Sequence, residues 1–305
     1  MACDLSMNTV KILTSQAVPG MVVSEDVYTK DLHLIISKDT TLTDKIITRL
    51  NFYSITDLYV YSDDNLVKTE ADYFENTFYS ELKKSEAFSR FYKAYHKSAN
   101  RLKNSMDDFL NNRDELEADK LMSEVRSILY QCGTNIELFH MLHCMREYDD
   151  TTYIHSLNVS LIGNILGKWL KFSSEDLEAI TLAGLLHDVG KLFIPNEIIA
   201  KPGKLTEDEF SLIKTHTIRG YHILKDKKID ERIKNVALMH HERCDGSGYP
   251  NGLLSHEIDP FAKLIAIADV YEAMTSARVY RGPLCPFEVI NLFETEGYLK
   301  YDAKY

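Results

Sequence analysis

Apolar and polar positions alternate at helical spacing through the second half of the chain, beyond residue 135. Between short polar breaks, the apolar residues form stretches as long as ordinary globular helices. The stretches cover residues 137–146, 154–170, 177–188, 206–224, 229–241 and 262–276. Successive helices joined by short breaks predict an all-α domain over residues 136–305.

Two of these helices carry clear end signals. Thr206 is followed three residues later by Glu209, the capping-box spacing in which each side chain satisfies a backbone N–H of the other residue. Gly190 follows the 177–188 stretch, and glycine commonly ends a helix. We therefore expect one helix to begin at Thr206 and another to stop at Gly190.

The first part of the chain has a different pattern. Residues 9–62 carry short runs rich in β-branched and aromatic residues, which favour strands. Examples are the runs at 22–23, 34–36 and 58–61. One short helix interrupts them, with Thr43 as its N-cap and Leu50 near its end. These features predict a small β-rich N-terminal domain over residues 1–66.

A helical connector is predicted between these two regions, over residues 67–135. Large apolar side chains recur there at helical spacing: Phe74, Phe78, Leu82, Phe88, Phe91 and Tyr95. A second amphipathic segment covers residues 116–130. Such stripes are more often packing faces than cofactor sites, because aromatic side chains are commonly buried. We expect the connector to dock on the larger domain or to join two copies into a homodimer.

Composition and charge narrow the class of protein. The chain has 305 residues, of which 45% are hydrophobic and 27% charged, as in globular proteins with one or two domains. Its net charge of −11 argues against DNA or RNA polymers as partners, because a protein that binds them needs a basic face. An acidic protein can still bind an anionic substrate if metal ions supply local positive charge.

The cysteines and the apolar runs indicate a cytoplasmic protein. The five cysteines are scattered and form no Cys-x-x-Cys pair, as expected for reduced thiols rather than a disulfide framework. The first residues lack the apolar core of a signal peptide. No run approaches the roughly 18 apolar residues of a membrane span, so we expect no membrane partner.

Histidines and acids concentrate in the predicted helical domain. Neutral imidazoles together with carboxylates are ligands that borderline divalent metals such as Fe, Mn or Zn accept. Several of these residues fall at predicted helix ends, where unpaired carbonyls and the helix dipole favour a cation. The candidate ligands are His155, His187, Asp188, His216, His240, His241 and Asp269. Seven side chains suffice for two ions if Asp188 bridges them.

Each candidate also has an ordinary interpretation. A lone histidine is more often a satisfied core or surface residue than a ligand. We apply that interpretation to His33, His96, His140, His143, His222 and His256. Asp269 lies in an otherwise apolar stretch, so it is either a ligand or a hydrogen-bonded core acid.

The order and spacing of these residues resemble the HD-GYP subgroup of the HD metal-dependent phosphohydrolases. The similarity covers roughly residues 140–300. It rests on His155, on the pair His187–Asp188 with Lys191 three residues later, and on the unbroken run of residues 240–250, HHERCDGSGYP. His216 and Asp269 complete the pattern. A His–Asp pair alone is common by chance, whereas the full ordered set is specific.

The resemblance implies a function. Members hydrolyse the bacterial messenger cyclic di-GMP to linear pGpG, and often to GMP, with two or three metals, commonly iron or manganese, on an all-α fold. Four residues would hold one ion: His155, His187, Asp188 and Asp269. The second ion would be held by Asp188, His216, His240 and His241. Trinuclear members carry a glutamate where this chain has Thr151, which favours two metals here.

For this reaction we expect a metal-bridging hydroxide to attack the phosphorus in line. The two metals would share Asp188 as a ligand, and Lys191 would neutralise phosphate charge or protonate the leaving oxygen. The alternative for Lys191 is a solvated surface lysine. Asp245 is expected to orient its loop or an outer-shell ligand rather than to contact metal.

Two further segments are expected to bind the substrate. Gly248 lets the backbone approach the ligand, Tyr249 can stack on or hydrogen-bond a guanine, and Pro250 stiffens the turn. An ordinary tight turn is the alternative. Arg278 and Arg281 occupy the places of two phosphate-binding arginines in the family, whose usual Asp-Arg-Pro-Tyr-Arg reads Ala-Arg-Val-Tyr-Arg at residues 277–281.

Two alternatives to cyclic di-GMP hydrolysis remain open. The same site could hydrolyse another cyclic dinucleotide, such as cyclic GMP-AMP. The chain could also be a receptor that binds the messenger without turnover, although degenerate ligands would be expected in that case. We also expect a further helix to follow residue 305 in a complete domain.

Overall fold

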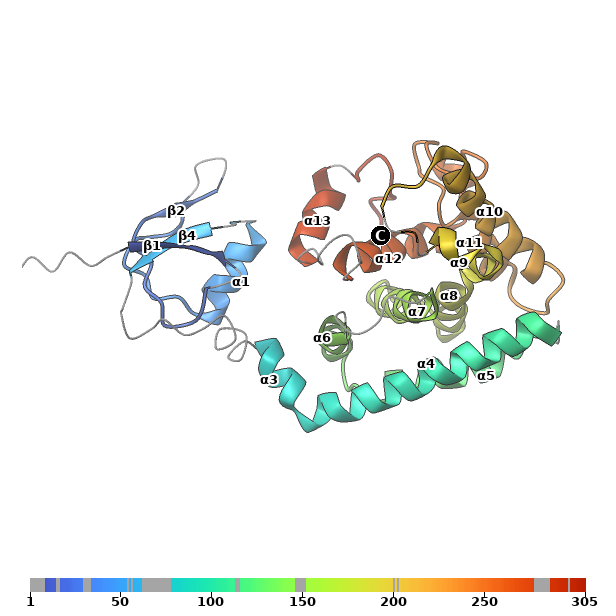
Figure 1. The fold of residues 1–305 in the computed structure, drawn as a ribbon, viewed down its shortest axis with the longest axis horizontal. Coiled ribbons are helices and arrows are strands. Elements are labelled where there is room, and N and C mark those ends of the chain that lie inside the picture. The colour runs from blue at the N-terminus through green and yellow to red at the C-terminus, as the bar shows by residue number, and fades with distance from the viewer. Residues whose placement is uncertain are drawn as a thin grey trace, which may run out of the picture. The chain divides into compact units, whose positions relative to one another are not determined.

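The computed structural model describes residues 9–14, 17–29, 34–53, 55, 57–61, 78–112, 116–145, 152–199, 201, 203–276, 286–295 and 297–305. The chain forms two compact units, Met1–Ser85 and Glu86–Tyr305. The larger unit contains every predicted metal ligand. The fold is mainly helical with a small β region at the N-terminus (Figure 1), which confirms the predicted fold class.

In its described residues, the N-terminal unit contains two antiparallel strand pairs and two helices. Strand β1 (Thr9–Leu13) pairs with β4 (Asp57–Tyr61), and β2 (Val27–Tyr28) pairs with β3 (Leu34–Ile36). The helices are α1 (Asp44–Phe52) and α3 (Phe78–Lys84). Its core includes Val23, Leu50 and Val60, which are at most 3% exposed. The predicted N-cap is confirmed, since the Thr43 hydroxyl accepts a hydrogen bond from the Ile46 N–H.

In the described residues of the larger unit, every helix or strand that is long enough to name is a helix. Its first helices are α4 (Glu86–Asn112), α5 (Ala118–Leu129), α6 (Asn135–Met145), α7 (Thr152–Trp169) and α8 (Ser174–Leu186). The next are η2 (Val189–Phe193), α9 (Asn196–Ile199), α10 (Glu207–Leu224) and α11 (Glu231–Met239). Then follow η3 (Ser255–Glu257), α12 (Pro260–Thr275) and α13 (Pro286–Thr295).

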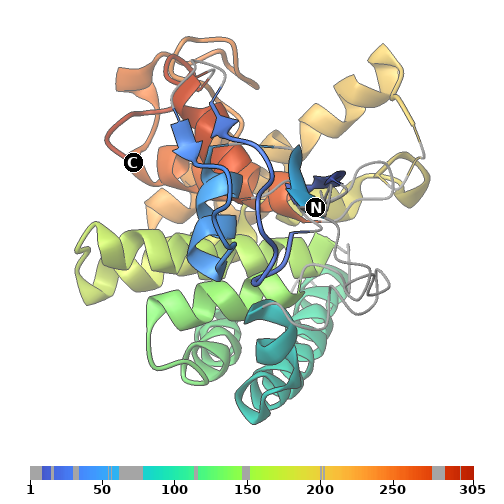
Figure 2. The same cartoon turned by 90° about the vertical axis from the view of Figure 1, so that its left-hand side faces the viewer.

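The helices of this unit pack in layers around α7 and α8. The α4–α5 pair contacts one side of α7 and α8, while α11 and α12 contact the other side. In Figure 2 the α4–α5 pair (teal) lies on one side of α6 and α7 (green). Phe91 and Tyr95 of α4 are at most 1% exposed, as expected for a packing face. Of the predicted connector helices, α4 and α5 therefore belong to the same compact unit as the candidate site, whereas α3 belongs to the N-terminal unit; their self-association stays a prediction.

Most predicted helix ends agree with the structure. Thr206 and Glu209 form the reciprocal capping box at the start of α10. Helix α8 ends at Leu186, two residues before the predicted end, and the chain continues through Gly190 as the short helix η2. Gly190 is needed there because a Cβ would lie 1.9 Å from the carbonyl oxygen of His216 on α10. The glycine allows two backbones to touch instead of stopping a helix.

Within the described ranges, no helix is at once long enough and apolar enough to cross a bilayer.

Candidate metal centre

Five segments of the larger unit bring the predicted ligands together. His155 lies in the first turn of α7, and His187 and Asp188 directly follow α8. His216 lies inside α10, and Asp269 inside α12. His240 and His241 directly follow α11. Two groups of donor atoms result, each within 4.8 Å: His155, His187 and Asp188, and Asp188, His216, His240 and His241.

The first group surrounds one carboxylate oxygen of Asp188. His155 Nε2 lies 3.5 Å and His187 Nε2 3.3 Å from Asp188 Oδ2. Asp269 completes this side, with its Oδ1 3.1 Å from His155 Nε2 and 4.0 Å from His187 Nε2. The second oxygen, Asp188 Oδ1, serves the other group. It lies 3.3 Å from His216 Nε2 and 3.5 Å from His240 Nε2. Asp188 is thus shared between the groups.

Backbone carbonyls fix the orientation of three of the histidines. His187 Nδ1 lies 2.7 Å from the carbonyl oxygen of Gly184, and His216 Nδ1 lies 2.7 Å from that of Ile213. His240 Nδ1 lies 3.0 Å from the carbonyl oxygen of Val236. A carbonyl can only accept, so each Nδ1 carries the proton and donates it. The Nε2 lone pairs are then directed at the shared carboxylate, as metal-binding imidazoles require.

The protonation states on the α11 side suit a metal. Burial lowers the pKa of His240 to about 4. Burial and the neighbouring His240 also lower the pKa of His241 well below its ordinary value. Both imidazoles are therefore neutral at neutral pH, the form that coordinates cations. Burial works against ionisation of Asp188, but the nearby His187 and Lys191 keep its pKa well below the usual range.

Negative charge accumulates around His155. Burial would lower the pKa of His155, but Glu272, Asp188 and Asp269 together raise it well above the ordinary value. Burial would likewise raise the pKa of Asp269, but His155 and His187 hold it well below the usual range. Three ionised carboxylates around one imidazole form a buried pocket that favours a cation.

Unsatisfied polar atoms also indicate that the donor set fits metal ions. Among the described residues, the buried side-chain atoms without a hydrogen-bond partner include His187 Nε2 and Asp188 Oδ1. Buried polar atoms are normally paired, and these two belong to the two donor groups. Imidazoles and carboxylates at this spacing fit divalent cations. The assignment of individual ligands stays a prediction.

Lys191 lies beside the shared carboxylate. Its Nζ is 2.5 Å from Asp188 Oδ2, because the turn of η2 keeps residues 188 and 191 on the same face. The side chain is 23% exposed, so it is accessible from outside the donor cluster. The expected same-face geometry is present, and Lys191 is not simply a solvated surface lysine.

The glycine-rich run packs directly on the end of α11. The Glu242 carboxylate accepts hydrogen bonds from the backbone N–H groups of Asn251 and Leu253, at 2.7 and 2.9 Å. A Cβ on Gly248 would lie 2.4 Å from the Cα of Glu242, so glycine is required at this position. The carbonyl of His241 accepts a hydrogen bond from the Tyr249 N–H. The loop is therefore fixed beside the metal ligands.

Three of the residues discussed in the sequence analysis, Asp245, Tyr249 and Pro250, lie in this loop. The Tyr249 ring stacks on the His241 imidazole, with centroids 4.7 Å apart, so one face of the ring is already covered. Pro250 follows it after a cis peptide bond. Asp245 accepts hydrogen bonds from the N–H and hydroxyl of Ser247, which agrees with a loop-orienting role. Arg278 and Arg281, like Thr151, lie outside the described residues.

Glu272 was not among the predicted site residues. It lies one turn after Asp269 on α12, is 5% exposed, and accepts a hydrogen bond from His155 Nδ1 at 2.5 Å. Its other oxygen accepts from Asn158 Nδ2, and Tyr95 of α4 donates to Asn158 Oδ1. The signal in the sequence was a second acid in the same apolar stretch, three residues after the first.

We expect Glu272→Gln to weaken metal binding by about 10- to 100-fold, the usual effect of losing a carboxylate that orients a metal-binding histidine. Glutamine retains the size of the side chain but cannot hold the Nδ1 proton of His155 as strongly. Metal content after dialysis against graded chelator concentrations measures the effect. Glu257→Gln, on η3, is the control. Unchanged metal retention in Glu272→Gln would contradict the orienting role.

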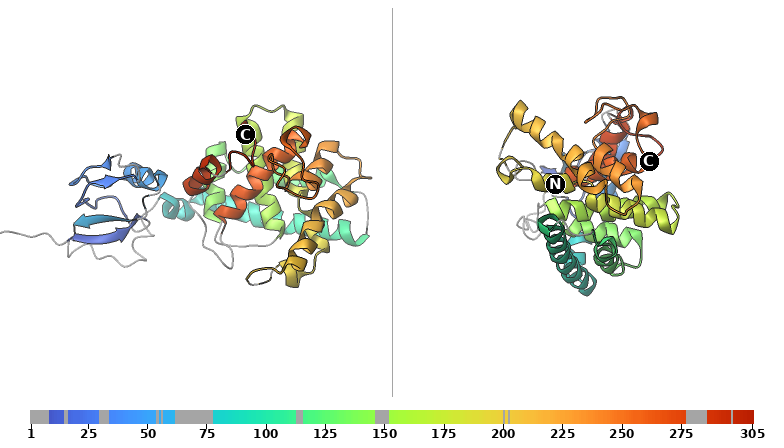
Figure 3. Two further views of the ribbon diagram at one scale, coloured as in Figure 1. Left: turned by 90° about the horizontal axis from the view of Figure 1, so that it is seen from above. Right: turned by 90° about the vertical axis from the view of Figure 1, so that its right-hand side faces the viewer.

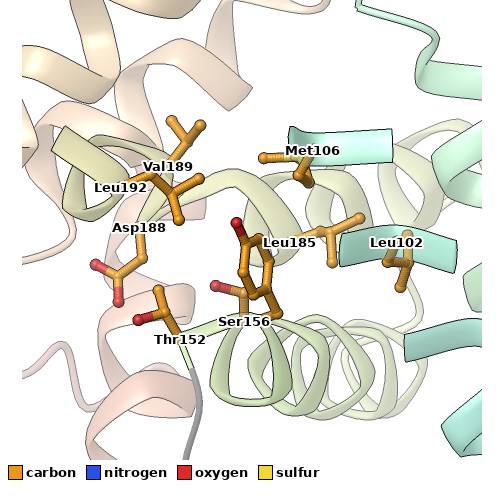
Figure 4. Close-up of a pocket in the computed structure, with 9 residues that line it drawn as sticks. Leu102, Met106, Thr152, Ser156, Leu185, Asp188, Val189 and Leu192 are labelled. Atoms are coloured by element: carbon orange, nitrogen blue, oxygen red, sulfur yellow. The ribbon is translucent and has the colours of Figure 1, made fainter. Parts of the chain in front are cut away.

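A small cavity of about 20 Å³ lies next to Asp188 (Figure 4). Leu102 and Met106 of α4 form part of its wall, together with Thr152 and Ser156 of α7. The helix predicted as part of a connector therefore reaches the surroundings of the shared carboxylate.

The part of the chain that carries the donor groups is similar to known proteins. The family model described as HD domain matches residues 143–305. A cyclic di-GMP phosphodiesterase of Pseudomonas aeruginosa is 37% identical over 170 residues, which are 55% of this chain and 40% of that protein. A 3'3'-cGAMP-specific phosphodiesterase of Vibrio cholerae is 43% identical over 145 residues, which are 48% of this chain and 34% of that protein. The matches therefore span less than half of either relative.

A solved structure shares the fold. An HDG"Y"P protein from Bdellovibrio bacteriovorus aligns with a TM-score of 0.59 and 20% identity, covering 97% of this chain and 96% of that one. At this identity the similarity supports the fold alone.

Proposed function

This chain belongs to the HD domain family, and we propose that it is a metal-dependent phosphodiesterase that hydrolyses cyclic di-GMP to linear pGpG and onward to GMP. The observation that carries the proposal is the pair of donor groups sharing Asp188, with the glycine-rich loop packed against them. The relatives named as cyclic di-GMP phosphodiesterases support the substrate class.

The donor set favours two divalent cations, for which we propose iron or manganese. His155, His187, Asp188 and Asp269 would hold one ion, and Asp188, His216, His240 and His241 the other. When bound, such a pair supplies Lewis acidity to a phosphodiester and lowers the pKa of water. The carbonyl-anchored histidines and the shared carboxylate contribute rigidity, so little reorganisation is needed when the substrate binds.

The remaining residues act on the substrate. The ammonium of Lys191, hydrogen-bonded to Asp188, is placed to stabilise charge on a phosphate or to give a proton to the leaving oxygen. The exposed part of Tyr249 would contact a base, since one face of its ring is covered by His241. Arg278 and Arg281 are proposed as phosphate ligands on the sequence pattern alone.

A second candidate substrate is 3'3'-cGAMP. It shares the phosphodiester ring with cyclic di-GMP and differs in one base, and a relative specific for it is 43% identical over the matched residues. A receptor without turnover is less favoured, because every predicted metal ligand is present in the sequence and adjoins the donor cluster.

The experiment is a substrate panel with the full chain. Protein purified without air is analysed for bound metals, then loaded with iron or manganese and incubated with cyclic di-GMP, 3'3'-cGAMP or a linear dinucleotide. We expect linear pGpG first, then GMP, and no product after chelation. Binding of cyclic di-GMP without product under all metal conditions would support the receptor instead.

A further inference from the structure

An exposed aromatic side chain stands beside the glycine-rich loop, outside the donor cluster. Phe210 of α10 is 46% exposed, and its ring centroid lies 6.4 Å from that of Tyr249. Lys214, one turn further along α10, places its Nζ 5.0 Å from the centroid of Phe210 and 6.0 Å from that of Tyr249. Two rings and one ammonium thus gather at one place on the surface.

This group continues outward from the proposed metal ligands. The His241 imidazole is stacked on Tyr249, and Tyr249 in turn contacts Phe210. Helix α10 carries both Phe210 and the buried metal-ligand candidate His216. Helix α10 is visible in Figure 3 as the gold helix standing out from its neighbours. A molecule bound at the donor cluster would therefore have this group at its side.

Packing does not account for the position of Phe210. The buried residues of α10 begin at His216 and continue toward its C-terminus, so the two turns that carry Phe210 and Lys214 contribute none. A phenylalanine left nearly half exposed forgoes part of its hydrophobic stabilisation. Single exposed apolar side chains are common, but here the exposed ring adjoins a cation and a second ring.

Lys214 also differs from two other lysines of the larger unit. Lys201 and Lys263 pair with Glu209 and Asp302, at 2.6 and 2.8 Å. In the described part of the chain, Lys214 has no carboxylate partner and instead lies over aromatic rings. Its charge is therefore available to an anionic ligand.

We propose that Phe210 and Lys214 form a base-binding subsite for the cyclic dinucleotide, an inference that rests on the proposed function. A purine stacks on the exposed face of Phe210, while Lys214 contacts the adjoining phosphate. Because the rings of Phe210 and Tyr249 are inclined by 78°, a base that stacks on Phe210 meets Tyr249 across an angle rather than being clamped between two parallel faces.

The test compares kinetics and metal content of Phe210→Ala, Phe210→Trp and Lys214→Met in the metal-loaded full chain. We expect Phe210→Ala to raise KM for cyclic di-GMP by about tenfold, the effect of losing one stacked base, with kcat and metal content unchanged. Phe210→Trp retains a stacking face and should restore the KM. Lys214→Met should raise KM and make it less sensitive to salt. Trp169→Ala, another exposed aromatic, is the control and should leave KM unchanged.

The outcomes separate the subsite from the proposed function. If wild-type protein hydrolyses cyclic di-GMP and Phe210→Ala keeps its KM within twofold, the subsite is refuted and the phosphodiesterase activity stands. A loss of metal from Phe210→Ala would also refute it, because the side chain would then support the donor cluster. If the wild-type protein neither binds nor hydrolyses any cyclic dinucleotide, both proposals fall together.

Discussion

Replacing Asp188 by asparagine is expected to lower the proposed hydrolysis of cyclic di-GMP by about a thousandfold and to remove most of the metal that the protein would bind. One oxygen of Asp188 faces His155 and His187, and the other faces His216 and His240. Asparagine keeps the volume but removes the charge shared by both donor groups. A bound metal stabilises the transition state by several kcal/mol. Losing about 4 kcal/mol of that stabilisation corresponds to a roughly thousandfold lower rate.

Metal analysis and single-turnover kinetics of Asp188→Asn measure these two effects separately. Asp119→Asn, an exposed acid on α5, is the matched control and should behave as the wild-type protein. Full metal content in Asp188→Asn together with wild-type turnover would contradict the shared role of this carboxylate, even if the overall function were correct.

The fold could be predicted largely from local signals. The period of apolar residues and the capping box at Thr206 are local, and α10 accordingly begins where predicted. The end of α8 was placed two residues too late because it depends on a distant segment. Gly190 touches the backbone of α10, a contact between residues far apart in sequence that no local pattern records.

The candidate site likewise contains residues that could be predicted from the sequence and residues that could not. The donor residues were predicted because their chemical types are rare together and their order resembles a known family. Glu272 was missed because its role depends on the approach of α7 to α12, which brings His155 within hydrogen-bond distance. Phe210 and Lys214 were missed because only the packing of the glycine-rich loop next to α10 gives them a common neighbour, Tyr249.

Gly190→Ala is expected to destabilise the larger unit by about 3 kcal/mol, at the upper end of the usual cost of overpacking. The added Cβ would lie 1.9 Å from the carbonyl oxygen of His216 and 2.7 Å from the backbone nitrogen of Gly220. Both contacts are with backbone, so no flexible side chain can move aside. For a unit of this size, the melting temperature should fall by about 10 °C, since each kcal/mol corresponds to about 2–4 °C.

The same substitution separates packing from chemistry, because Gly190 itself carries no functional group. To make room, η2 and α10 must move apart, which displaces His216 from Asp188 and should lower metal content along with stability. Gly133→Ala is the matched control, since its Cβ would meet only the Glu137 carboxylate at an ordinary 3.5 Å. A melting temperature for Gly190→Ala equal to that of Gly133→Ala would mean that α10 does not rest on η2 in solution. The position of His216 in the donor cluster would then need another cause.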